Sequence, residues 1–315
     1  MMYTLCRYHA NHMRISHAVR FIICLLMNVL IAAAQPKNSF QVNVNPDSAA
    51  NTTHETAQMV WGEPVPLATI LPVDSSANEA RTCMQRIQEE SRAPSEIIEV
   101  TMILIDHTSK SRTRKVTFYQ KSRTPNTMSR LIRFHTPAEL AGATILALEN
   151  LDRSDDWWIF APSYHMTRRI PSRNRSDTFL GTDLSYEDIT DLRLDHYTFR
   201  FTGVDTIRGK KCRLLEAIPV DSLTIDSSRY ARIVYWVDMV QPLYHKAVLY
   251  DHDNRITKEV HNSLAITEGG QWRWDRTEVI DIRKNHRTII EVINRSIGVD
   301  LPDRIFTERG MRRSG

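Results

Sequence analysis

Residues 156–162 read Asp-Trp-Trp-Ile-Phe-Ala-Pro, residues 168–170 read Arg-Arg-Ile, and residues 177–188 read Asp-Thr-Phe-Leu-Gly-Thr-Asp-Leu-Ser-Tyr-Glu-Asp. An apolar, aromatic strand is followed by a basic, polar loop and then by the start of a helix. Residues 184–192 are too polar for a helix inside a core, so we expect them to lie over another element. We interpret the stretch as the place where a meandering sheet sends a loop across its own open face.

Alternating apolar and polar residues on both sides of this stretch predict β-strands. A first group of about five strands is expected at residues 98–105, 114–119, 128–135, 144–148 and 157–160. A second group is expected at residues 197–201, 212–217, 229–238, 243–250, 256–260, 272–282 and 288–293. Strands spaced by about ten residues, with few helices, predict an antiparallel meander. Several strands are apolar on both faces, which favours a curved sheet whose concave face could enclose a ligand.

Two helices are expected outside the strands. Residues 76–93 begin with Ser-Ala-Asn-Glu, a capping box that satisfies backbone amides of the first helical turn. An apolar stripe with helical spacing runs from Ala80 to Ile87, and Pro94 ends the helix. The stripe predicts that this helix packs on the sheet. A short helix is also expected within residues 302–313.

Composition gives an ordinary picture of a globular chain. The 315 residues are 42% apolar and 25% charged, and their length allows one large β domain or two smaller ones. The net charge of +4 includes three arginines within residues 1–34; without them, 38 basic residues face 37 acidic ones. This balance gives no reason to expect nucleic acid as a partner.

The N-terminal residues have the parts of a secretory signal. Arg14 and Arg20 precede an apolar run over residues 21–34 that ends in three alanines, so cleavage is expected near Ala34. The run is shorter than the roughly 20 residues of a membrane-spanning helix, although an uncleaved anchor is the alternative. Translation could start at Met1 or at Met13.

The remainder of the chain divides into two parts. Residues 35–75 are rich in Asn, Pro, Ser, Thr and Ala without a sustained period, which predicts a linker or a poorly ordered arm. Residues 76–315 are expected to form one domain. Two cysteines follow the leader, Cys83 and Cys212, which could pair or remain buried free thiols.

No motif for catalysis or metal binding stands out. The chain lacks a Gly-x-Ser-x-Gly elbow, a phosphate-binding glycine loop and a His-Glu-x-x-His sequence. His245 and His252, with the aspartates beside His252, fit a solvated hairpin turn better than a zinc site. The arginines at positions 168, 169, 173 and 175 could bind a phosphate or a lipid headgroup, or form a solvated loop.

The central stretch resembles the LolA-like family of outer-membrane lipoprotein-sorting proteins, in particular its longer branch, often encoded beside RND-type exporters of the MMPL class. The resemblance rests on residues 156–162, 168–170 and 177–188, with support from residues 242–251, 286–288 and 301–307. It covers about residues 76 to 313. Where the family usually has Tyr-Leu before the proline, this chain has Phe160 and Ala161.

The resemblance implies a mainly β fold, in which an antiparallel curved sheet forms an open half-barrel and a few short helices cover its concave face. It also implies a periplasmic carrier of lipid or acylated protein that works with an RND/MMPL-type exporter of the inner membrane. We expect a monomer that is not an enzyme, with no catalytic residue, cofactor, metal or nucleic-acid partner. The alternative is a regulatory module that senses lipid or protein on the same scaffold. A secreted hydrolase would need a nucleophile–base pair that the sequence does not display.

The predicted lipid-binding wall is aromatic and draws on Trp157, Trp158, Phe199, Phe201, Tyr235 and Trp236. Because successive strand residues point to opposite faces, half of these side chains must face away from a ligand. The loop over the opening is expected to contain Arg168, Arg169, Phe179 and Tyr186. The alternative for each aromatic residue is a place in a closed core.

Export is directly testable. We expect N-terminal sequencing of the protein from its native host to begin close to residue 35, because a signal peptidase cleaves after small residues such as those at positions 32–34. A mature chain that begins at Met1 or Met13 would contradict the prediction.

Overall fold

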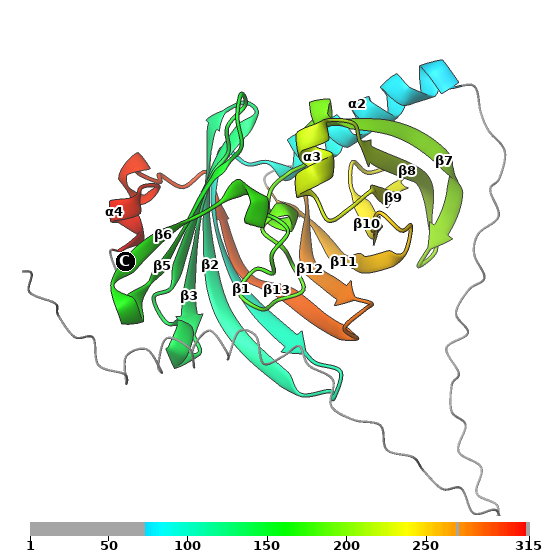
Figure 1. Ribbon diagram of the computed structural model, residues 1–315. Helices are drawn as coiled ribbons and strands as arrows, with labels where there is room; N and C mark the ends of the chain where they lie inside the picture. The colour runs from blue at the N-terminus through cyan, green and yellow to red at the C-terminus, as the bar shows by residue number, and fades with distance from the viewer. Residues whose placement is uncertain (1–72, 269–270, 313–315) are drawn as a thin grey trace, which may run out of the picture. The chain divides into compact units, whose positions relative to one another are not determined.

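One antiparallel sheet of thirteen strands organises the protein (Figure 1). The structure is a computed structural model that describes residues 73–268 and 271–312, all within the unit Pro64–Gly315. Its strands are β1 (Ser95–Ile105), β2 (Ser111–Thr124), β3 (Thr127–Thr136), β4 (Thr144–Leu148), β5 (Asp156–Ala161), β6 (Met166–Ile170), β7 (Tyr197–Ile207), β8 (Lys210–Pro219), β9 (Arg232–Asp238), β10 (Tyr244–Tyr250), β11 (Ile256–Glu268), β12 (Gln271–Asp281) and β13 (His286–Ile297). The expected leader lies outside the described residues, as does nearly all of the expected linker.

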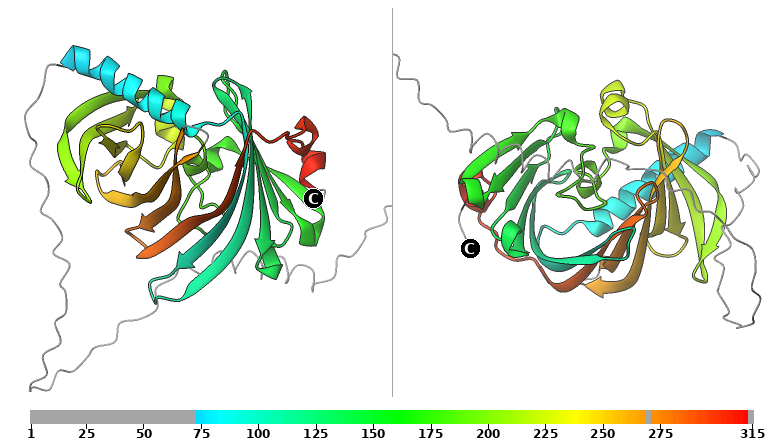
Figure 2. Two further views of the ribbon diagram at one scale, coloured as in Figure 1. Left: turned by 180° about the vertical axis from the view of Figure 1, so that it is seen from behind. Right: turned by 60° about the horizontal axis from the view of Figure 1, so that its bottom comes forward.

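The strand order explains why one segment must cross the sheet. The order is β6-β5-β4-β3-β2-β1-β13-β12-β11-β10-β9-β8-β7, so the first and last strands pair in the middle. The two edge strands, β6 and β7, are consecutive in the sequence. Their connection, residues 171–196, has to span the width of the sheet, and we call it the crossing segment. The predicted antiparallel half-barrel is confirmed, and Figure 2 shows the strands curving around the crossing segment.

Asp183 fixes the middle of the crossing segment to β13. Its carboxylate accepts hydrogen bonds from Nδ1 of His286, at 2.7 Å, and from Oγ1 of Thr288, at 2.6 Å. The backbone amide of Asp183 donates to the same threonine hydroxyl at 3.0 Å. Asp183 is 2% exposed and Thr288 is fully buried. A carboxylate is buried at little cost only when it is hydrogen-bonded, so these contacts specify where the segment lies.

Ion pairs attach the second half of the crossing segment to β11, to the residue that follows α2 and to the residue that precedes β5. The pairs are Asp188 with Lys258 of β11, Asp191 with Arg92, and Arg193 with Asp155. The Asp188 carboxylate lies 2.5 Å from Nζ of Lys258, whose side chain is 3% exposed. Ion pairs in such positions add little to the free energy of unfolding, because both charges lose hydration on folding. Their main effect is to fix where the crossing segment lies on the sheet.

Apolar side chains on the concave face form two separate clusters. One contains Val100, Met102, Leu104, Val116, Ile132, Phe134, Ala143, Ile145, Ala147, Trp157, Phe179 and Tyr186. The other contains Ala80, Met84, Ile87, Phe199, Leu215, Ala217, Tyr230, Ile233, Tyr235, Val237, Ala247 and Leu249. The first is closed by the crossing segment, through Phe179 and Tyr186. The second is covered by the helix α2.

Helix α2 (Val73–Ser91) starts three residues before the predicted capping box and ends two residues before the predicted boundary. Ala80, Met84 and Ile87 are buried in the second concave cluster, as the apolar stripe predicted. The amide of Gln88 donates to the backbone carbonyl of Leu192 at 2.9 Å, which joins α2 to the crossing segment. Figure 1 shows α2 lying beside β7. Among the described residues, no helix is long and apolar enough to cross a membrane.

The convex face is covered in part by the C-terminal segment. In place of one predicted helix, this segment contains the 3-10 helix η6 (Asp303–Ile305) and the short helix α4 (Glu308–Met311). Its Phe306 and Met311 are buried against Leu131 and Leu146 of the sheet.

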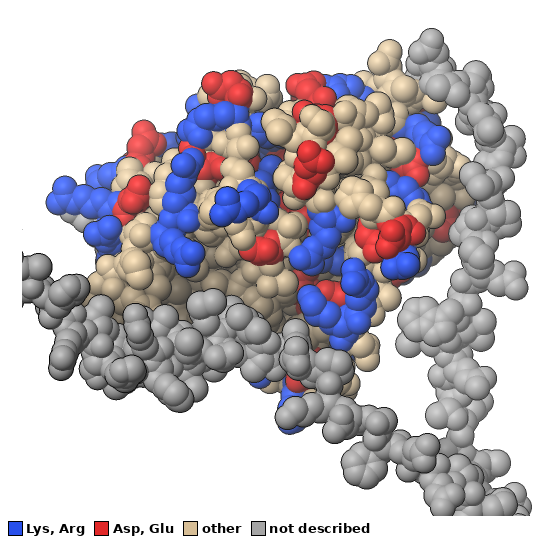
Figure 3. Space-filling view, viewed as in Figure 1, with Lys and Arg blue, Asp and Glu red and all other residues tan. Residues whose placement is uncertain are grey.

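The structure corrects two expectations for the central stretch. The predicted helix over residues 184–192 is only a 3-10 turn, η4 (Glu187–Ile189). The polar side chains of this segment contact the sheet, and the helix does not continue beyond this turn. Arg168 and Arg169 lie in the edge strand β6, where we expected a loop. On the face seen in Figure 3, basic and acidic side chains are interspersed with uncharged surface.

Replacing Asp183 tests the anchor of the crossing segment. D183A leaves the buried hydroxyl of Thr288 and the ring of His286 without their acceptor. We expect a loss of about 3 kcal/mol in the free energy of unfolding, measured by urea denaturation. The matched control is D253A in the exposed β10–β11 turn, which should cost less than about 0.5 kcal/mol. Equal effects of the two substitutions would contradict the proposed anchor.

Candidate ligand-binding site

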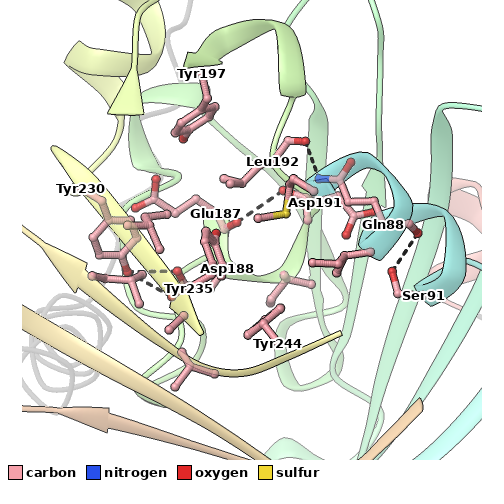
Figure 4. A pocket seen from close by; sticks show the side chains of 18 of the residues that line it. Gln88, Ser91, Glu187, Asp188, Asp191, Leu192, Tyr197, Tyr230, Tyr235 and Tyr244 are labelled. Carbon is pink, nitrogen blue, oxygen red and sulfur yellow. Dashed lines mark hydrogen bonds between the residues drawn. The ribbon is translucent and has the colours of Figure 1, made fainter. Parts of the chain in front are cut away.

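A cavity of about 410 Å³ lies on the concave face, between α2, the crossing segment, α3 (Ser222–Ser227) and strands β9 to β12 (Figure 4). The curvature of the sheet forms one wall, and α2 and the crossing segment form the other. Asp221 caps α3 by accepting a hydrogen bond from the amide of Thr224 at 2.8 Å, which holds this short helix at the cavity. The volume is toward the lower end of the range for ligand pockets, about 300–1,000 Å³.

Part of the cavity wall is aliphatic. Its members come from α2 and from the inward positions of successive strands: Met84, Ile87, Ile233, Leu249, Val260 and Val279. Val260 and Val279 are direct cross-strand partners on β11 and β12. Side chains of this kind gain free energy by covering an acyl chain, at about 0.8 kcal/mol for each buried methylene.

Tyrosines bring hydroxyl groups into the same cavity. Tyr197, Tyr230, Tyr235 and Tyr244 all line it. Burial raises the pKa of each phenol, to about 12 for Tyr197 and well above the ordinary value for Tyr230 and Tyr235. The phenols are therefore neutral near pH 7 and act as hydrogen-bonding groups without charge. The Tyr230 hydroxyl donates to Asp188 at 3.0 Å.

Among the described carboxyl groups whose pKa is shifted, Glu187 is the one whose pKa is raised. Burial and the nearby charge of Asp188 raise its pKa, although a hydrogen bond from Ser228, the Arg229 amide and the charge of Arg175 act in the opposite direction. Its Oε1 accepts from the amide of Arg229 at 3.3 Å. Protonation is thus favoured over a wider pH range than for an exposed glutamate.

A smaller cavity of about 150 Å³ lies elsewhere on the concave face, against Met102, Phe118 and Ile290. Leu184 and Ile189 of the crossing segment line both cavities. The crossing segment thus contributes wall to two cavities on the inner face of the sheet.

Comparison with known proteins identifies the family. A family model described as that of an uncharacterized protein matches residues 126–313, more than half of the chain. A DUF1329 family protein from Desulfovibrio piger is 26% identical with a TM-score of 0.70, covering 75% of this chain and 99% of that one. A domain from Vibrio parahaemolyticus, described as an outer-membrane lipoprotein-sorting protein, is 22% identical with a TM-score of 0.70, covering 75% and 100%.

A LolA superfamily protein from Nitrosomonas europaea is 19% identical with a TM-score of 0.59, covering 73% of this chain and 98% of that one. The chain belongs to the family of the matching model, and its fold is similar to that of the LolA superfamily protein. No curated protein matches the sequence. Likeness at such low identity establishes the LolA-like fold, and the ligand has to be argued from the cavity.

The aromatic residues predicted for the lipid-binding wall of this LolA-like protein are distributed over both faces of the sheet. Tyr235 lines the cavity. Trp157 is 1% exposed in the first concave cluster, where its ring contacts Tyr186 edge to face. Phe199 is buried in the second cluster, and Phe201 packs against it.

Two of those aromatic residues are on the convex face. Trp158 packs against the cluster under the C-terminal segment. Trp236 donates from its indole nitrogen to Asp205 at 2.7 Å, and Lys246 lies over its ring. This distribution is what strand alternation requires, because adjacent residues point in opposite directions.

The four residues expected over the opening also separate into two groups. Phe179 and Tyr186 lie on the crossing segment, with their rings in edge contact and buried in the first concave cluster. Arg168 and Arg169 are exposed on β6, and Arg169 pairs with Asp156. These two arginines lie outside the lining of the cavity.

Sequence reasoning missed the contribution of α2 and of residues 187–193 to the site. The inward stripe of α2 was visible, but nothing in it distinguished a cavity wall from a packed interface. Arg175, which the sequence named with Arg168, Arg169 and Arg173 as a candidate for binding a phosphate or a lipid headgroup, is the only one of the four in the cavity lining.

Within the described part of the chain, no group of three or more His, Cys, Asp and Glu side chains is arranged to hold a metal ion. His245 bonds to Asp238 at 2.7 Å and stacks edge to face on Trp274. Cys83 and Cys212 are free thiols.

The raised pKa of Glu187 gives a pH-dependent prediction. The unfolded chain releases this proton near the ordinary value of 4.5, whereas the folded protein retains it to higher pH. The stability of the wild type relative to E187Q should therefore fall as pH rises from 4.5 through the raised folded pKa, and then become constant. Urea denaturation between pH 4 and pH 8 measures the difference. D226N, which removes an exposed carboxylate of α3, is the control, and a pH-independent difference for E187Q would refute the argument.

Proposed function

We propose that this protein is a periplasmic carrier that binds a lipid, or a protein through its acyl chain, in the concave cavity and moves it toward the outer membrane. The observation that carries the proposal is a cavity of about 410 Å³ with an aliphatic wall, on a LolA-like scaffold. Burying eight to ten methylenes there would supply on the order of 6–8 kcal/mol before the cost of ordering the chain. Binding of this kind needs no catalytic group.

The proposed place in the cell has two supports. The leader ending near Ala34 favours export, and the resemblance to carriers encoded beside RND/MMPL-type exporters favours an inner-membrane exporter as the source of cargo. We propose that the mature protein works as a monomer that passes between the two membranes.

Cargo carried by the purified protein tests the proposal. We expect mass spectrometry of organic extracts from natively purified protein to find acyl lipid, and V260D to abolish it. Val260 is a half-buried residue of the cavity wall. An incoming chain would have to strip water from the new carboxylate, at a cost of several kcal/mol. L214D is the matched control, because Leu214 is similarly buried on the opposite face, beside Trp236.

Folding and function are separated by two further measurements on the same three proteins. Circular dichroism and thermal unfolding establish that V260D remains folded, and an environment-sensitive fatty-acid probe measures its affinity. No lipid in the wild-type extract and no saturable probe binding would reject the carrier. Binding without any transfer of probe between vesicles would favour the sensing module instead.

A further inference from the structure

Arg175 is a cation of the cavity lining whose guanidinium group has no partner among the described residues. It follows the 3-10 helix η3 (Ser172–Asn174) in the crossing segment, where its carbonyl accepts a hydrogen bond from the amide of Glu187 at 3.0 Å. Its side-chain Nε is buried and has no hydrogen-bond partner. Among the described residues, none forms a hydrogen bond or an ion pair with its guanidinium group. A guanidinium held this way normally has an anion or a carbonyl beside it.

The other ionised groups around the cavity are matched. Those pairs and contacts are Asp188 with Lys258, Asp191 with Arg92, Arg193 with Asp155, and Arg273 with the carbonyl of Glu90. Glu187 feels the charge of Arg175 but makes no ion pair with it, and its carboxyl is shifted toward the neutral form. Among the described residues, no carboxylate therefore forms an ion pair with Arg175.

Hydroxyl groups surround this end of the cavity. Helix α3 packs beside η3, so the arginine that follows η3 lies near the residues that α3 contributes. The polar lining at this end comes from His196, Tyr197, Thr224, Ser227 and Ser228. The charge of Arg175 acts to lower the pKa of the Tyr197 phenol, against the larger effect of burial. The aliphatic wall described above belongs to the same cavity.

We propose that Arg175 binds the anionic headgroup of a single-chain amphiphile, a carboxylate or a phosphate monoester, while the acyl chain lies along the aliphatic wall. This inference deepens the proposed function and rests on it. The volume of about 410 Å³ favours one chain. A charge-assisted bond to the guanidinium of this half-buried arginine selects the anion, whereas the chain itself gives affinity without selecting a headgroup.

Calorimetric titration of the whole protein with three ligands sharing an oleoyl or oleyl chain tests the inference. The ligands, kept below their micellar concentrations, are oleate, oleoyl lysophosphatidate and oleyl alcohol. The wild type should bind at least one of the two anions about tenfold or more tightly than the alcohol, the difference expected for one charge-assisted contact. Oleate and lysophosphatidate then distinguish a carboxylate ligand from a phosphate ligand.

The variants assign that preference to one residue. R175Q should lose it, with its affinity for oleyl alcohol unchanged within about twofold, whereas R175K should retain part of it because the positive charge remains. R173Q is the matched control, since Arg173 is exposed, two residues away and outside the cavity lining.

Each outcome bears on a different claim. Equal binding of all three ligands by the wild type, or a preference that survives in R175Q, overturns the role of Arg175 and leaves the carrier in place. A general loss of affinity in R175Q, the alcohol included, would show that the arginine is structural and would also overturn it. Failure of every ligand to bind the wild type rejects the carrier itself.

Discussion

Two edge strands that are neighbours in the sequence impose the main constraint on this structure. Because β1 and β13 pair at the centre of the sheet, β6 and β7 lie at its opposite edges, and their connection has to return across the concave face. Polar backbone cannot cross an apolar surface unless its groups are satisfied. Where the segment passes over β13, the backbone amide of Asp183 donates to the Thr288 hydroxyl, and the Asp183 carboxylate accepts from His286 and Thr288.

The position of the crossing segment determines how each half of the concave face is used. Over β1 to β5 the segment inserts Phe179 and Tyr186, which fill the space above Trp157 and close a core. Over β9 to β12 it turns Glu187 and Asp188 toward the sheet, and these side chains leave a cavity that α2 covers from the other side. The crossing segment thus divides the concave face into a half with a closed core and a half with room for a ligand. In both halves the strand residues alternate between the concave and the convex face in the same way.

The chemistry of the cavity follows from the two elements that cover it. Strands β9 to β12 contribute most of the aliphatic wall together with Tyr235, Tyr244 and Arg273, whereas the crossing segment and α3 contribute the carboxyl groups, Arg175 and further hydroxyl groups. An amphiphile has both an apolar chain, which can lie on the aliphatic wall, and a polar headgroup, which can contact the polar lining. The tyrosine phenols are neutral near pH 7 and the pKa of Glu187 is raised, whereas Arg175 is a cation that has no ion pair among the described residues.

The sequence by itself determined the antiparallel meander, the inward stripe of α2 and the special character of residues 156–188, because periodicity and capping are local properties. It could not distinguish Trp157 from Tyr235. Both are aromatic residues at inward strand positions, yet one is covered by Tyr186 and the other faces the cavity. In the same way, the sequence could not distinguish Arg175, which lines the cavity, from the exposed Arg173 two residues before it. Only the tertiary structure decided these cases, because what lies over an inward side chain depends on where the crossing segment passes, and contacts distant in sequence fix that path.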